Sequence, residues 1–423
     1  MTSLAEPVTS SAPVTTAPPA ASTDRFSGGR YLKLVLVLGA MTAIGPLTID
    51  TYLPALPVLS AELNASDSQA QLTITGLLVG LGLGQLVIGP LSDAVGRRKP
   101  LLIGLVAHAL MSVLCALAPS ITLLAVTRTL QGLAGAAVAV VSMAVVRDLF
   151  SGVKAAQLLS RLMLVVGVAP ILAPSIGSGL MSLTSWRGIF VVLAVAAVAL
   201  VVLALVALPE TLPPARRRAG NLGDSLRSYR ALFADRIFVA MVLVSGLMFA
   251  TLFAYISGAP FILQELYSLT PQQFGLAFSA NAIGLVLMTQ LNPWLLRRIT
   301  PATALFAAVV ISVLGAAALV VTTTTGFGGL LGFMVPLFFV ASAAGLSFPN
   351  APAIALNRHG EAAGSAAALL GAAQFVIGGS IAPLVGALGN GTPVPLAGVI
   401  LGAATLALVV MLTTRRQLVD SNS

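Results

Sequence analysis

The sequence predicts an all-α membrane protein whose twelve transmembrane helices form two six-helix bundles related by pseudo-symmetry. Hydrophobic residues make up 57% of the 423-residue chain and charged residues only 8%, whereas soluble domains carry about 25% charged residues. The apolar residues fall into twelve runs, each near the roughly 20 residues that cross a bilayer's hydrocarbon. A polar segment separates the first six runs from the last six.

Charged residues, Pro and Gly mark the ends of the predicted spans. The first bundle, residues 30–208, holds spans at 31–55, 70–92, 100–118, 121–146, 156–181 and 187–208. The second bundle, residues 237–414, holds spans at 237–262, 272–295, 301–322, 328–351, 363–388 and 393–414. Residues 209–236 are predicted to be a central loop, and residues 415–423 a tail. Residues 1–29 are rich in Ser, Thr, Ala and Pro without an apolar core, which predicts a disordered tail and no signal peptide.

The basic residues predict how the helices are oriented. With a cytoplasmic N-terminus, 20 of the 22 Lys and Arg residues lie on the cytoplasmic side, with only Arg187 outside and Arg128 within a span. Because Lys and Arg are enriched in cytoplasmic loops, both termini are predicted to be cytoplasmic. The net charge of +9 thus reflects topology and does not predict a nucleic-acid partner.

The residues do not support the function of an enzyme, a metal-binding protein or a receptor. The single cysteine, Cys115, lies in an apolar run, so neither an internal disulfide nor a zinc site is expected. The two histidines, His108 and His359, fall in different regions, and no nucleotide-binding loop is present. The sequence therefore predicts no cofactor, no metal and no enzymatic activity, and it contains no soluble domain through which a receptor would signal.

A weak internal repeat supports the division into halves. GLGLGQLVIGPLSDAVGRRKP, between the second and third spans, and GLVLMTQLNPWLLRRITP, between the eighth and ninth, share an apolar helix, a Pro, a double Arg and a closing Pro. Repeated halves around a central cavity are the usual plan of secondary transporters, which bind substrate near the middle of the membrane.

The loop GPLSDAVGRRKP is predicted to carry a gate made of charges. Its glycines permit a tight turn, and Asp93 could pair with Arg97, Arg98 or Arg147. Such a cluster would hold helix ends together in one conformation and release them in another. The alternative is an ordinary cytoplasmic loop, for which the arginines suffice. The residues assigned to this gate are Gly89, Asp93, Gly96, Arg97, Arg98, Arg147 and Asp148.

Asp50 and Arg128 are the only charged side chains that cannot be placed at a membrane surface. An ionisable group in hydrocarbon costs a few kcal/mol at least and so predicts a functional site. Arg128 lies seven residues, or roughly 11 Å, into its span, and Asp50 about five residues from the outer end of its own. Their similar depths permit an interaction, directly or through water. The alternatives are that Asp50 caps a helix at the interface and that Arg128 is a structural tie to backbone carbonyls.

The fifth span contains Gly167, Pro170, Pro174, Gly177 and Gly179. Proline removes backbone hydrogen bonds and bends a helix, whereas glycine lets a neighbouring helix approach closely. A bent, tightly packed helix between the halves would suit rocking between two conformations. Glycine and proline are, however, common in membrane helices generally.

Aromatic and amide residues in otherwise apolar spans are candidates for a substrate cavity, since they offer stacking and a few hydrogen bonds. For each of them, helix packing is an equal alternative. His108 could relay protons, although a hydrogen bond to a neighbouring helix explains a single buried histidine better. The cavity candidates are Tyr52, Gln131, Met143, Phe249, Phe253, Tyr255, Asn281, Asn350 and Gln374.

These motifs resemble a known family. GPLSDAVGRRKP and LAVTRTLQGLAGAA resemble the loop signature and fourth-helix motif of the major facilitator superfamily, and GVAPILAPSIGSG resembles the helix 5 motif of its drug antiporters. IDTYLPALP, VVRDLF, SWRGIF, LPETLPP, FAYISGAPFIL, GLSFPNAPAIAL and GSAAALLGAAQF narrow the resemblance to the Bcr/CflA group, which confers bicyclomycin and chloramphenicol resistance. One departure is Ala94, where the loop signature usually has a basic residue.

The resemblance implies a monomeric antiporter in a bacterial cytoplasmic membrane, which exports drugs in exchange for protons by alternating access. It assigns proton coupling to Arg128, and proton or substrate binding to Asp50. Its partners would be a small-molecule drug, protons and lipid. The alternative is an exporter of an endogenous metabolite, or an uptake permease of the same fold, because fold alone does not decide substrate or direction.

Overall fold

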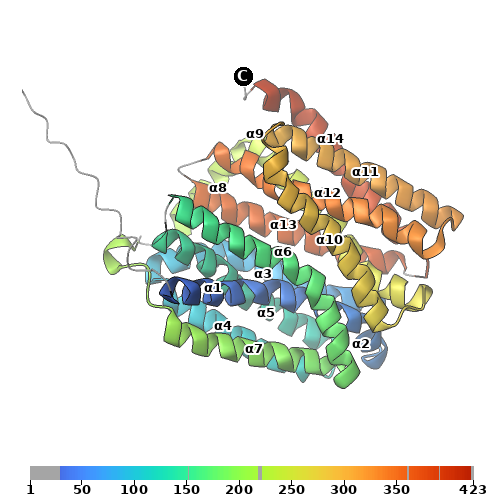
Figure 1. Ribbon diagram of the computed structural model, residues 1–423, viewed down its shortest axis with the longest axis horizontal. Coiled ribbons are helices and arrows are strands. Elements are labelled where there is room, and N and C mark those ends of the chain that lie inside the picture. Colours follow the sequence, from blue (N-terminus) through green and yellow to red (C-terminus); the bar gives the residue numbers. More distant parts are fainter. Residues whose placement is uncertain (1–28, 151, 218–221, 360–361, 390, 421–423) are drawn as a thin grey trace, which may run out of the picture.

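A computed structural model describes residues 29–150, 152–217, 222–359, 362–389 and 391–420. Within these ranges twelve helices are long and apolar enough to cross a membrane. They form two bundles that lie side by side, with the first half of the chain in one and the second half in the other (Figure 1). The predicted class, an all-α membrane protein with twelve transmembrane helices in two bundles, is confirmed. Most of the predicted N-terminal tail lies outside the described residues.

The first half contains six crossings. The first crossing consists of α1 (Gly29–Asp50), a short 3₁₀ turn, η2 (Leu53–Ala55), and α2 (Leu56–Glu62). The other five are α3 (Asp67–Val95), α4 (Arg98–Ala116), α5 (Ile121–Leu149), α6 (Gly152–Leu183) and α7 (Trp186–Ala207).

The second half repeats this arrangement. Its first crossing is α9 (Arg236–Phe261), extended by a π turn, η4 (Ile262–Leu266). It is followed by α10 (Pro271–Leu295), α11 (Pro301–Thr325), α12 (Gly329–Asn357), α13 (Ala363–Leu388) and α14 (Val394–Asp420). Between the halves lie η3 (Pro214–Arg216) and α8 (Leu222–Ala234).

One predicted boundary was wrong, and one predicted loop contains a helix. The first crossing continues to Glu62 and does not end at residue 55, because the prolines near residue 55 occupy first-turn positions, where a missing N–H is tolerated. The central segment 209–236 is not only a loop, since it contains α8. The last predicted span, 393–414, agrees with the span Val394–Thr414, and α14 itself runs on to Asp420.

Corresponding helices in the two halves begin in the same way. A capping box between Ser66 and Gln69 starts α3, and one between Thr270 and Gln273 starts α10. In each box the two side chains satisfy two of the backbone N–H groups that a helix start leaves free. Because α3 and α10 are the second crossings of their halves, this shared start adds to the sequence evidence for an internal repeat.

Twelve crossings return the chain to the side on which it started. We call the side that holds the start of α1, α8 and the end of α14 the termini side, and the other side, where α2 lies, the far side (Figure 1). The links from α3 to α4, from α5 to α6 and from α10 to α11 all lie on the termini side.

The halves meet through two helix pairs, α3 with α13 and α6 with α10. The hydroxyl of Thr75 in α3 donates to the Gly379 carbonyl in α13 at 2.6 Å, and the hydroxyl of Ser178 in α6 donates to the Pro271 carbonyl at the start of α10, also at 2.6 Å. These bonds lie in the far-side portions of the helices. Toward the termini side α6 and α10 diverge (Figure 1).

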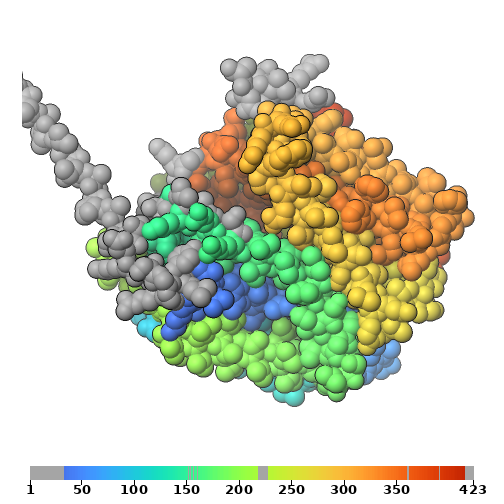
Figure 2. All heavy atoms as spheres, viewed as in Figure 1, coloured from blue at the N-terminus to red at the C-terminus, as the bar shows by residue number. Residues whose placement is uncertain are grey.

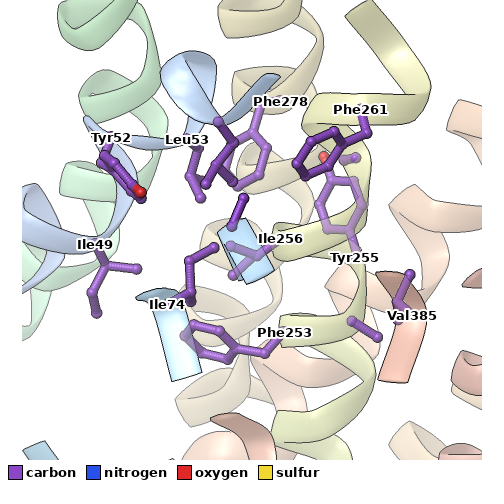
Figure 3. Packing of buried hydrophobic residues seen from close by; sticks show 14 of the residues in the cluster. Ile49, Tyr52, Leu53, Ile74, Phe253, Tyr255, Ile256, Phe261, Phe278 and Val385 are labelled. Carbon is purple, nitrogen blue, oxygen red and sulfur yellow. The ribbon is translucent and has the colours of Figure 1, made fainter. Parts of the chain in front are cut away.

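The buried apolar residues show the same asymmetry. One cluster, which we call the far-side seal, joins the two halves, with Ile49 and Leu53 of the first half packing near Phe253 and Phe278 of the second (Figure 3). Two further clusters each belong to one half, except that Leu86 of α3 packs against the cluster of the second half. Figure 2 shows a hollow between α6 and α10 toward the termini side. The protein is therefore closed on the far side and open toward the termini side.

The contact between α6 and α10 predicts a cross-link. The hydroxyl oxygens of Ser175 and Ser279 lie 3.4 Å apart, so cysteines at these positions are placed to form a disulfide. We expect the double variant Ser175→Cys and Ser279→Cys, made in a Cys115→Ser background, to cross-link under mild oxidation. The measurement is whether α6 and α10 stay joined after proteolysis between α7 and α9. Each single cysteine serves as control, and failure of the pair to cross-link would contradict this packing.

Candidate functional site

Arg128 of α5 lies at the centre of a polar network in the first half. Its side chain is completely buried. Its Nη1 donates to the Thr48 carbonyl of α1 at 3.1 Å and to Oε1 of Gln131 at 2.8 Å. The guanidinium carbon lies 4.6 Å from the centre of the Tyr52 ring, a cation–π distance. One charge thus holds together the end of α1 and the middle of α5.

The network continues into α4. Nε2 of Gln131 donates to the Ser112 hydroxyl at 2.8 Å, and Nε2 of His108 lies 3.0 Å from the Thr48 hydroxyl. The expectation that His108 bonds to a neighbouring helix is therefore confirmed. Gln131 and Tyr52, proposed as cavity residues, belong to this network, since the Tyr52 hydroxyl also meets the Thr73 hydroxyl at 2.9 Å.

Arg128 has more donors than its neighbours use. Its Nε and Nη2 are buried and find no partner among the described residues. The tie to a backbone carbonyl, considered as the structural alternative, is present through Thr48, yet it occupies only part of the guanidinium. Buried donors without partners are uncommon and call for an explanation.

Asp50 does not pair with Arg128. Thr48 and Tyr52 face Arg128, and Asp50, two residues from each, lies on the opposite face because successive helical residues turn by about 100°. In the described part of the chain Asp50 has no hydrogen bond or ion pair, although it is only 4% exposed. The expected direct interaction is therefore absent. Asp50 instead faces the second half and lies near Tyr255 of α9.

The depth of Asp50 also differs from expectation. The first crossing continues helically to Glu62, twelve residues beyond Asp50, whereas the sequence predicted about five. Asp50 is consequently not an interfacial acid. It lies level with Arg128, because Arg128 bonds to Thr48 within the same turn of α1.

The polar candidates of the second half mostly tie helices together. Nδ2 of Asn281 donates to the Tyr255 hydroxyl at 3.3 Å, which joins α10 to α9. Asn350 of α12 bonds Oδ1 of Asn292 in α10 at 2.7 Å. Gln374 of α13 donates to the Ser245 hydroxyl of α9 at 2.5 Å. For Asn350 and Gln374 these bonds match the packing alternative.

Aromatic residues of the second half form a cluster around Phe249. The Phe249 ring centre lies 4.8 Å from that of Phe253, and 5.2 Å from those of Phe348 and Phe375. Phe249, Phe348 and Phe375 are half-buried, so part of each ring is accessible. Sequence reasoning missed Phe348 and Phe375, because a phenylalanine in an apolar helix carries no signal of its own. Met143 is half-buried and packs within the first half.

Arg97 forms the centre of the predicted gate. It pairs with Asp93 at 2.5 Å and with Asp148 at 2.9 Å, and so joins α3 to α5. Burial alone would lower the pKa of Arg97, but the two carboxylates outweigh burial and hold it above its ordinary value. Gly96 has a φ of 100°, which confirms the tight turn. A side chain at Gly89, in contrast, would meet open space.

Glu210, which follows α7, is a gate residue that the sequence reasoning missed. Its carboxylate accepts the backbone N–H groups of Arg97 at 2.8 Å and Arg98 at 3.2 Å, at the start of α4. Burial alone would raise the pKa of Glu210, but these bonds, together with those from Leu212 and the charge of Arg217, hold it below its ordinary value. Glu210 lies in the segment LPETLPP, whose resemblance to the Bcr/CflA group was the only sequence signal for this residue.

Not every predicted gate residue takes part. Of the three arginines expected as possible partners of Asp93, the partner is Arg97. Arg147 is exposed and has no hydrogen bond or ion pair within the described ranges. Its neighbour Asp148 points to Arg97 instead. Arg98 contributes mainly through a bond from Nη2 to the Leu205 carbonyl at 2.9 Å. The second half has a smaller counterpart, in which Asp235 pairs with Arg358 at 3.1 Å.

Among the predicted glycines of α6, Gly177 lets the helix pack closely against a neighbour. A Cβ at Gly177 would collide with the Thr51 carbonyl just after α1, and one at Gly167 would touch Val286 of α10 at 3.7 Å. Pro170 and Pro174 lie inside α6. Gly179 faces open space, so no packing requirement explains it.

The carboxylate of Glu210 predicts a pH-dependent contribution to stability. Glu210→Gln should lower the melting temperature at neutral pH through the loss of about 1 kcal/mol of hydrogen bonding. Because folding lowers the pKa of Glu210, this contribution is present above the unfolded pKa and is lost as the pH falls through the folded pKa. The melting temperatures of wild type and Glu210→Gln should therefore converge as the pH falls from 7 to 4. Equal curves for wild type and Glu210→Gln at pH 7 would contradict the assignment.

The sequence and the fold were compared with known proteins. Residues 36–383 match the Major Facilitator Superfamily. YdgK of Bacillus subtilis (strain 168), an uncharacterised MFS-type transporter, is 36% identical over 402 residues, which cover 94% of this chain and 99% of YdgK. A bicyclomycin resistance protein homologue of Haemophilus influenzae is 29% identical and covers 86% and 91% of the two chains. The multidrug resistance protein MdtL of Escherichia coli (strain K12 / DH10B) is 26% identical and covers 88% and 93%.

Solved structures share the fold at low sequence identity. The D-xylose–proton symporter superposes with a TM-score of 0.74 at 15% identity, over 90% of this chain and 97% of the symporter. A bacterial homologue of the human lysosomal transporter Spinster, in an inward-facing and occupied conformation, gives 0.71 at 14%, over 92% and 98%. At such identities the likeness concerns the fold alone. Together with the match over residues 36–383, it establishes that the chain is a transporter, not an enzyme, and belongs to the Major Facilitator Superfamily.

Proposed function

We propose that this transporter exports small organic drugs across a bacterial cytoplasmic membrane in exchange for protons. Relatives named for bicyclomycin and multidrug resistance support drug export. The basic residues support a cytoplasmic termini side, so the hollow opens toward the cytoplasm. The protein works as a monomer with its own central cavity. The observation that carries the proposal is Asp50, a carboxyl without a partner at the junction of the halves.

Asp50 is the proton carrier in this proposal. Its carboxyl is 4% exposed and lies beside the far-side seal, and no described residue offers it a hydrogen bond or a counter-charge. An ionised carboxylate in such a place is very unfavourable, whereas the neutral acid is tolerated. The closed far side therefore favours protonated Asp50, and opening of the far side brings water to it.

Arg128 positions Asp50 and sets the local potential. It holds the carbonyl of Thr48 and lies against the ring of Tyr52, the two residues that flank Asp50 on either side. A fixed positive charge in the same half favours release of a proton from Asp50 whenever water reaches the acid. The two donors of Arg128 without partners are available to an anion or to water in another conformation.

The accessible rings of Phe249, Phe348 and Phe375 supply the drug-binding surface. They come from α9, α12 and α13, so three helices of the second half contribute to one aromatic wall. Such a wall accepts flat, weakly charged molecules by stacking without demanding one pattern of hydrogen bonds. In the proposed cycle the charge cluster of Arg97, Asp148 and Glu210 keeps the termini-side ends of α3, α4 and α5 together while the halves rock.

Asp50→Asn tests proton coupling. The amide keeps the size of the side chain but cannot release a proton, so we expect proton-coupled export to be lost while the protein still folds and reaches the membrane. The measurement is accumulation of a labelled drug, with and without an uncoupler, in cells that express each variant at equal levels. Unchanged export by Asp50→Asn would contradict the role assigned to Asp50. If only an endogenous metabolite accumulates differently, the alternative of a metabolite exporter is favoured.

Arg128→Ala tests the electrostatic role. We expect it to reduce transport at least tenfold, because it removes a buried charge and about 2–3 kcal/mol of hydrogen bonding within one network. Arg298→Ala, at an exposed arginine that rests on Trp294, should have little effect. Arg128→Lys keeps the positive charge but not the hydrogen bonds of the guanidinium, so recovery of transport in this variant supports the electrostatic role. Equal transport by Arg128→Ala and Arg298→Ala would contradict it.

A further inference from the structure

We propose that the far-side ends of α4 and α7 bind one phospholipid, whose acyl chain fills an apolar groove and whose phosphate meets Arg187. The transport cycle does not use this region, because it lies on the outer surface of the first half. In this region a lipid-facing groove ends next to a charged residue at the membrane surface.

The groove lies between two helices and has a volume of about 370 Å³. Only apolar side chains line it, among them Val113 and Leu117 of α4 and Val191, Ala194, Val195 and Val198 of α7. Its walls face outward, since Leu117 is 70% exposed and Val195 is 64% exposed, whereas Ala194 at its floor is only 6% exposed. In a membrane such a surface contacts the hydrocarbon of the lipids. Because this surface is concave, it favours a flexible acyl chain.

Arg187 lies at the far-side mouth of this groove. Residues 187, 191, 195 and 198 fall on one stripe of α7, because residues three or four apart lie on the same helix face. Nη2 of Arg187 also donates to the Ala118 carbonyl at 3.4 Å, just after α4 ends. The guanidinium therefore spans the two helices that form the groove.

The guanidinium of Arg187 is held in place and still has free N–H donors. It stacks on the Trp186 ring at 4.2 Å and pairs with the Glu62 carboxylate, which also accepts the Trp186 indole N–H at 2.7 Å. One of its five N–H donors bonds Glu62 and a second bonds the Ala118 carbonyl, and its side chain remains 33% exposed. Arginine with free donors binds phosphate oxygens well. The neighbouring tryptophan is typical of the membrane interface.

The occupant is a phospholipid and not the transported drug. The groove carries no polar group along its length, so it offers nothing to orient a drug, whereas an acyl chain needs only apolar contact. Its one cation lies at the end where a headgroup of the far-side leaflet would lie. In this arrangement chain and headgroup are recognised together, which ordinary annular lipid contacts do not require.

The test compares two exposed valines on the same face of α7. Val195→Phe fills the groove, whereas Val202→Phe, at a position 56% exposed and one heptad further along, lies outside it. Each protein is purified in mild detergent and titrated with phosphatidylethanolamine or phosphatidylglycerol, and bound lipid is counted by native mass spectrometry. We expect wild type and Val202→Phe to retain one lipid under conditions where Val195→Phe retains about tenfold less, a difference of about 1.4 kcal/mol.

A second pair of variants tests the headgroup contact. Arg187→Gln removes the cation, while Glu62→Gln breaks the same ion pair but leaves the cation in place. We expect lipid retention to fall in Arg187→Gln and to persist in Glu62→Gln, so that loss of the ion pair alone cannot explain the result. Equal retention by Val195→Phe and Val202→Phe, equal retention by Arg187→Gln and Glu62→Gln, or a wild type that carries detergent only, would each overturn the proposal.

Discussion

The first half of this transporter is organised around the charge of Arg128. A guanidinium among apolar helices must find its hydrogen bonds inside the protein, and here it takes them from the Thr48 carbonyl and from Gln131. Gln131 in turn holds Ser112, and Thr48 meets His108. The requirement to satisfy one charge thereby sets the relative positions of α1, α4 and α5.

The position of Asp50 follows from that arrangement. Because Thr48 and Tyr52 turn toward Arg128, the residue midway between them must face away, and the direction away from α5 is the boundary with the second half. Arg128 therefore holds α1 in place, whereas Asp50 lies at the boundary between the halves. Protonation of an acid at that boundary can be coupled to separation of the halves, whereas an acid bound to Arg128 would be shielded from it.

The charge clusters outside the membrane act on helix ends. Glu210 binds the first backbone N–H groups of α4 from a segment that follows α7, and Arg97 joins α3 to α5. Both sets of contacts lie within the first half, so they stiffen a bundle and leave the other half free to move. Contacts between the halves are instead made by uncharged groups, such as Thr75 and Ser178 with backbone carbonyls, which can be broken at lower cost.

The sequence alone determined the fold class and the twelve crossings, and it singled out Asp50, Arg128, Asp93 and Arg97 as candidates, because hydropathy, charge and turn residues act locally and can be counted along the chain. The tertiary structure decided which of these residues meet. It turned Asp50 away from Arg128, paired Asp93 with Arg97 and not with Arg147, added Glu210, and gathered Phe348 and Phe375 around Phe249. These outcomes depend on helix rotation and on contacts between distant segments, which no local pattern encodes.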